Sequence, residues 1–223
     1  MTFSLIARCP VTCQFGMVIA SSSPAVAARC SHLRAGVGAV ASQNITDPGL
    51  GAMVLDLLAQ GVSAQMALAS VTKSQQNIDY RQLLVIDQRG QTAIHSGARC
   101  LGVWGQASGT DCAAGGNLLA NEAVPGAMVA AFITATGDFG SRLLVALMAG
   151  LDAGGEAGPV HSAGLKIVDK LDWPLVDLRV DWSTAPIQDL ATVWQIYQPQ
   201  MAAYVQRAVD PTAAPSYGVP GNI

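Results

Sequence analysis

The hydroxyl at position 2 is the first side chain of this sequence that could act as a nucleophile. Thr2 follows the initiator Met1, and methionine is commonly removed when the second residue is small. A threonine at the new amino terminus would carry both a hydroxyl nucleophile and, in its own α-amine, a base with a pKa of about 8. Its branched side chain has few χ1 rotamers, which helps to fix the hydroxyl. The alternative interpretation is an ordinary threonine near a chain end.

Other candidate site residues lie where predicted strands end or loops begin. Amide donors that could stabilise an oxyanion are Gln43 and Asn44, between a predicted strand and a helix, and Asn117, beside two glycines. Turn formation is the alternative role for these amides. His161 and Ser162 follow a glycine-rich loop and could flank a cleft. Adjacent strand residues point to opposite faces, so these two do not form a triad by themselves.

Two of the arginines and the five cysteines are further candidates for binding or chemistry. Arg8 and Arg99 could bind a carboxylate through their paired donors, with surface ion pairing as the alternative. The cysteines show no CxxC spacing, and Cys9 and Cys13 lack a second ligand pair that would complete a zinc site. We therefore expect free thiols, no metal site and no cofactor, since there is also no phosphate-binding glycine loop.

The composition limits the classes of partner. The chain has 223 residues, of which 51% are hydrophobic and only 12% charged, with a net charge of −3. The basic residues are scattered, which argues against binding nucleic acid or an anionic membrane. The chain shows neither a signal-peptide pattern nor an apolar run of about 18–20 residues, so we expect a cytoplasmic protein without a membrane span. The weakly charged surface predicts a homo-oligomer.

The hydrophobic pattern predicts hairpins that alternate with pairs of helices. Helices are expected to begin near residues 48 and 63 and to span 123–134, 139–149 and 187–207. The expected strands span 2–8, 15–20, 36–42, 81–87, 91–96, 112–119, 161–168 and 175–180. The opening strands are too close together for crossover helices, which argues against a Rossmann-like fold. The order predicts an α/β (α+β) fold: a four-layer αββα sandwich of two mainly antiparallel sheets.

Four motifs, TFSLIAR, GMVIASSSPAV, AGVGAVASQN and GGNLLA, occur in the order typical of a known bacterial family. On these motifs the chain resembles DUF1028, a family of unknown function that is grouped with the N-terminal-nucleophile hydrolases. The resemblance covers most of residues 2–180. It implies the αββα fold and the chemistry described for Thr2, but no substrate.

The resemblance also implies where polar groups should surround the nucleophile. In this superfamily they lie at the end of the second strand, a position that Ser21 and Ser23 occupy here. Proteasome-like relatives use Asp and Lys in this region, and this sequence supplies neither. Members of DUF1028 favour a basic run before the late strand, whereas residues 156–162 here contain no arginine. This departure argues against a shared mode of binding an anionic substrate.

Two domains and three functional hypotheses follow as expectations. Residues 1–184 are assigned to the N-terminal-nucleophile-hydrolase-like domain. Residues 185–223 are assigned to a C-terminal helix and irregular tail that resembles a proposed peptidoglycan-binding extension. The leading function is hydrolysis of an amide bond in a small amide or peptide-like substrate. The alternative is a non-catalytic scaffold or assembly module. A third hypothesis, which the C-terminal resemblance suggests, is a cell-wall-associated binding protein.

Overall fold

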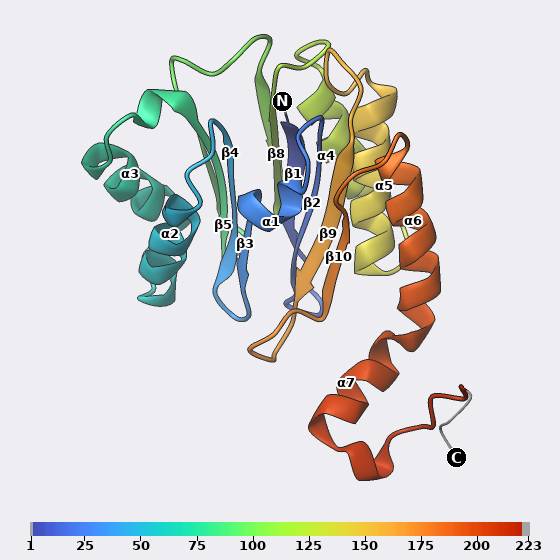
Figure 1. Cartoon of the computed structure of the whole chain (residues 1–223). Coiled ribbons are helices and arrows are strands. Elements are labelled where there is room, and N and C mark those ends of the chain that lie inside the picture. Colours follow the sequence, from blue (N-terminus) through green and yellow to red (C-terminus); the bar gives the residue numbers. More distant parts are fainter. Residues whose placement is uncertain (1, 220–223) are drawn as a thin grey trace.

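The structure, a computed structural model, describes residues 2–219 and consists of four layers in the order helix, sheet, sheet, helix (Figure 1). Helices α2 (Gly49–Ala59) and α3 (Ala64–Ser74) cover one sheet. The other sheet is covered by α4 (Val124–Thr134), α5 (Phe139–Asp152) and α6 (Pro186–Tyr197). The predicted αββα sandwich is therefore confirmed.

Both sheets are antiparallel throughout the strand pairs that the structure describes. The larger has the order β10-β9-β2-β1-β8-β7 and the smaller the order β3-β4-β5-β6. The larger sheet comprises β1 (Thr2–Arg8), β2 (Phe15–Ser21), β7 (Gly105–Gly109), β8 (Cys112–Asn117), β9 (Ser162–Val168) and β10 (Val176–Val180). The smaller comprises β3 (Ser31–Arg34), β4 (Gly38–Asn44), β5 (Arg81–Asp87) and β6 (Thr92–Ser96). Strand β1 lies near the centre of the larger sheet.

Successive side chains of β1 point to opposite faces of the larger sheet and therefore lie in two different environments. Phe3 and Leu5 belong to the core between the larger sheet and helices α4–α6. Ile6 belongs to the core between the two sheets, and Ser4 hydrogen-bonds across to the smaller sheet. Because side chains alternate along a strand, Thr2 faces the space between the sheets together with Ser4.

Three short elements were absent from the sequence prediction: α1 (Val26–Cys30), β3 and β7. The short helix α1 begins after Ala25, whose φ of 52° is left-handed, and its first turn has no side-chain cap that would indicate a helix in the sequence.

The predicted strand 112–119 is too long. It ends at Asn117, because Leu118 adopts a left-handed φ of 52° that breaks the strand.

The predicted helix 187–207 is two helices. A 3-10 turn at Gln198–Gln200 separates α6 from α7 (Met201–Val209). Pro199 lies inside this turn and cannot supply a backbone N–H to a continuous helix. Ile187 and Trp194 of α6 lie in the core beneath the larger sheet, whereas α7 projects away from the sandwich (Figure 1). The domain boundary at residue 185 stays a prediction.

No helix within residues 2–219 combines the length and the apolar character that a membrane crossing requires.

Close backbone approach fixes α1 against the larger sheet. A Cβ added at Gly164 on β9 would lie 2.4 Å from the Cβ of Ala27 on α1. The glycine therefore allows the helix to lie directly on the strand that begins with Ser162.

Replacing Gly164 by alanine should lower the free energy of unfolding by about 1–3 kcal/mol, because α1 must shift away from β9. Urea unfolding followed by circular dichroism measures this change. Gly158→Ala is the matched control, since a Cβ there meets nothing within 4 Å. Equal stabilities of the two variants would contradict the packing described.

Candidate functional site

Polar side chains form a row across adjacent strands at one end of the larger sheet. Thr2 on β1 is paired with Asn117 on β8, and Ser21 on β2 is paired with Ser162 on β9. The β1–β2 register pairs Phe3 with Ala20, so continuing it by one residue places Ser21 opposite Thr2. All four polar residues are buried. The polar row is thus Thr2, Asn117, Ser21 and Ser162, side by side at the ends of four strands.

An amide network lies beneath the polar row, between the two sheets. The Ser4 hydroxyl donates to Gln43 Oε1 at 2.7 Å, and Gln43 Nε2 donates to Gln82 Oε1 at 2.9 Å. Asn117 Nδ2 donates to the same Gln82 oxygen at 3.3 Å. Asn117 Oδ1 is buried and has no hydrogen-bond partner among the described residues. This oxygen is an acceptor beside Thr2 that a ligand N–H could satisfy.

Gln43 and Asn44, neighbours in the sequence, have different surroundings. Gln43 belongs to the amide network, whereas Asn44, the last residue of β4, has a left-handed φ of 72° and contacts two residues that are distant in the sequence. Its side chain donates to the Tyr80 carbonyl at 2.6 Å and accepts from the Leu101 N–H at 3.2 Å. Sequence reasoning missed Gln82, because nothing local distinguishes this glutamine within an apolar strand.

The serines of the polar row also hold the turn that leads into α1. Ser21 Oγ accepts from the Ser23 N–H at 3.0 Å. The Ser162 hydroxyl donates to the Ser23 carbonyl at 2.6 Å and accepts from the Val26 N–H at 3.2 Å. These bonds give Ser21 and Ser162 a structural role, and they place Ser23 next to the polar row.

Glu156 is a buried carboxylate at the same end of the sheet, and sequence reasoning did not select it. Its two oxygens accept from the Ser22 N–H at 3.0 and 3.2 Å, and its backbone forms a bridge with Leu119. Burial raises the pKa of Glu156 from 4.5 to about 7, against the hydrogen bonds from Ser22, which lower it. The only local signal was a lone acidic residue in a glycine-rich loop.

His161 lies beside the polar row. Its backbone N–H donates to the Ser21 carbonyl at 2.8 Å, which connects it to the strand end. Its ring stacks on Trp182 with centroids 4.4 Å apart, and Nδ1 lies 3.1 Å from the Ser183 carbonyl. His161 therefore borders the polar row through its backbone, while its ring is engaged with residues that follow β10.

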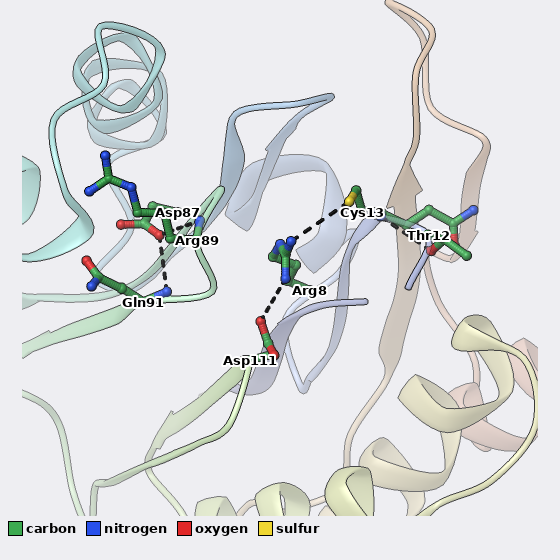
Figure 2. Close-up of polar contacts among 8 residues, drawn as sticks. Arg8, Thr12, Cys13, Asp87, Arg89, Gln91 and Asp111 are labelled. Carbon is green, nitrogen blue, oxygen red and sulfur yellow. Dashed lines mark hydrogen bonds and ion pairs between the residues drawn. The ribbon is translucent and has the colours of Figure 1, made fainter. Parts of the chain in front are cut away.

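The two candidate arginines are engaged elsewhere. Figure 2 shows Arg8 in an ion pair of 3.2 Å with Asp111. It lies at the opposite end of β1, about 20 Å from Thr2 for six residues of strand. Arg99 is exposed, stacks on the ring of Tyr80 and hydrogen-bonds to its hydroxyl. Neither arginine enters the site assembled here.

The polar row is closed in this structure. Thr2 is only 4% exposed. Cavities elsewhere on residues 2–219 include one between α3 and β6 and one between α5 and α6. A structural role for Thr2 fits this closure, and a catalytic role requires that the site open.

The fold and this polar row define an αββα sandwich with buried polar groups at one end of its central strands. The sequence profile of DUF1028, described as a family of unknown function, matches residues 2–190. The chain therefore belongs to the DUF1028 family.

One solved structure agrees with this assignment, and others share less similarity. The crystal structure of SPO2555 from Silicibacter pomeroyi, a DUF1028 protein, is 30% identical, with a TM-score of 0.83 over 88% of this chain and 89% of that chain. Anbu (ancestral beta-subunit) from Yersinia bercovieri is 12% identical, with a TM-score of 0.39 over 91% and 97%. The Anbu (Gly-1) mutant from Hyphomicrobium sp. strain MC1 is 10% identical, with a TM-score of 0.44 over 91% and 97%. Similarity at the level of the two Anbu structures supports no inference about function. No curated protein is significantly similar in sequence.

Replacing Gln82 by methionine should lower the free energy of unfolding by about 2–5 kcal/mol. The apolar side chain fits a similar volume but leaves the buried donors of Gln43 and Asn117 without their shared acceptor. Urea unfolding measures the loss. Gln65→Met on the exposed face of α3 is the matched control and should change stability by less than about 0.5 kcal/mol. A stable Q82M variant would show that the amide network contributes little.

Glu156 should make the stability depend on pH. Its folded pKa of about 7 lies above the ordinary 4.5, so the fold favours the protonated carboxyl. That contribution is full below pH 4.5 and is lost as the pH rises toward 7. The unfolding free energy of the wild type should therefore fall relative to that of Glu156→Gln across this range. Urea titrations at stepped pH measure it, and a constant difference between the two proteins would contradict it.

Proposed function

We propose that this protein hydrolyses amide bonds, with Thr2 as the nucleophile of a mature chain that begins at Thr2. The observation that carries the proposal is the place of Thr2 in the polar row. It lies between Ser21 and Asn117 on the flanking strands and faces the space between the sheets. A hydroxyl nucleophile needs such neighbours, because hydrogen-bonding groups must hold both the nucleophile and the substrate amide.

The chemistry would proceed by acyl transfer. The Thr2 hydroxyl gives its proton to the α-amine as Oγ attacks the substrate carbonyl carbon. The carbon–nitrogen bond then breaks, and the departing nitrogen takes the proton from the amine. Water attacks the resulting ester and releases the acid, and the Thr2 hydroxyl is restored. In this scheme the unpartnered Asn117 oxygen accepts an N–H of the substrate amide.

The surroundings of Thr2 favour a neutral substrate. The polar row consists of hydroxyl and amide groups, and Arg8 is bound to Asp111 at the far end of β1. A small amide or a short peptide-like amide therefore suits the site better than an anionic substrate, which would need a paired cation.

A non-catalytic scaffold is the second candidate. It is favoured by the near-complete burial of Thr2. In this interpretation the polar row only joins strand ends.

Protein purified from its own cells should have an intact mass that lacks Met1, and it should hydrolyse members of a panel of neutral amides. Thr2→Val keeps the shape but removes the hydroxyl, so activity should fall by at least about 100-fold. Thr2→Ser keeps the hydroxyl and should retain activity within about tenfold. Native mass spectrometry of the same sample tests self-association, which the weakly charged surface leads us to propose.

Retention of Met1 in all of the native protein would exclude a free α-amine at Thr2 and would favour the scaffold. Activity of the folded Thr2→Val variant equal to that of the wild type would exclude the hydroxyl as nucleophile.

A further inference from the structure

Glu156 lies across the end of β1, just beyond Thr2. Strands β2 and β8 flank β1 on its two sides. Ser22 is the first residue after β2, and its N–H donates to both oxygens of Glu156 at 3.0 and 3.2 Å. Leu119 lies two residues after β8, and it forms a backbone bridge with Glu156. A residue that contacts both flanking strands beyond their ends must lie in front of the strand between them.

The carboxylate of Glu156 has capacity for another hydrogen-bond donor. Glu156 is only 5% exposed, so its oxygens are largely removed from water. Among the described residues, Ser22 supplies the hydrogen bonds that these oxygens accept, whereas a carboxylate offers about four acceptor sites. A buried carboxylate is costly unless a charged or hydrogen-bonded partner compensates it. The site therefore fits one further donor, ideally a cation.

We propose that Glu156 is a positioning residue that anchors the α-amine of the mature Thr2. This role rests on the proposed function, because the α-amine exists only in a chain that begins at Thr2. Because β1 begins at Thr2, the nitrogen of this residue belongs to the strand end in front of which Glu156 lies. In the ammonium form it donates to the carboxylate. In the neutral form the same contact orients the nitrogen lone pair toward the Thr2 hydroxyl.

Glu156 does not exchange a proton with the substrate in this arrangement. The proton of the Thr2 hydroxyl passes to the amine and then to the departing nitrogen, while the carboxylate fixes where the amine lies. The pKa of Glu156 agrees with this placement, because burial raises it while the positive charge of the chain's amino terminus lowers it. The charge of His161 also lowers the pKa of Glu156.

The test is a titration of the Thr2 α-amine by nitrogen-15 NMR in mature protein labelled at threonine. In the wild type the carboxylate stabilises the ammonium form. Glu156→Gln should therefore lower the proton affinity of the amine about tenfold. Glu156→Asp should lower it less, since the charge remains on a shorter side chain. Glu122→Gln replaces the other glutamate, which is exposed, and should leave the titration unchanged.

An unchanged amine titration in folded Glu156→Gln would overturn the proposal. If this variant does not fold, the titration of Glu156→Asp decides between a lowered proton affinity, which supports the anchor, and an unchanged one, which overturns it. The titration requires no turnover. An inactive protein whose amine responds to Glu156 would therefore reject amide hydrolysis but keep the anchor, and an active protein whose amine does not respond would do the reverse.

Discussion

The amide network between the two sheets is the constraint on which the rest of the site depends. A buried amide costs free energy unless its donors and acceptors are paired, so Gln43 and Gln82 must meet across strands β4 and β5. Gly115 makes the link to the larger sheet possible. A Cβ there would lie 2.9 Å from Leu84, so the glycine lets β8 approach β5. Asn117, two residues further on, reaches Gln82 because of this approach and so holds its place beside Thr2.

The parts of the fold that follow from local patterns could be predicted from the sequence. The bounds of β1 and β5 match their apolar runs, and Ser63 caps α3 by accepting from the Met66 N–H. The unpredicted β7 is an edge strand of small and polar residues, without the β-branched side chains that indicate a strand. The five-residue helix α1 is too short for a helical repeat to show. Both elements form because of their neighbours in space.

Some residues of the candidate site could also be predicted from local patterns, and others could not. Thr2, Ser21 and Asn117 could be named from their positions at strand ends, and the sheet register places them side by side. Gln82 and Glu156 could not, because their importance comes from contacts with residues far away in the chain. Gln82 bonds to a residue 39 positions earlier, and Glu156 bonds to one 134 positions earlier. Hydrogen bonds between residues this far apart depend on the topology of the fold, so a local sequence pattern does not predict them.

The polar groups that stability does not explain are the strongest argument for chemistry at this end of the sheet. Ser21 and Ser162 are accounted for, since their hydroxyls hold the turn into α1. The Asn117 oxygen is different: it is buried without a partner among the described residues, which costs about 1–3 kcal/mol. Glu156 adds a buried carboxylate whose ionisation burial opposes. A scaffold would gain stability by replacing both groups with apolar ones, so these two residues add to the case for catalysis that the place of Thr2 in the polar row carries.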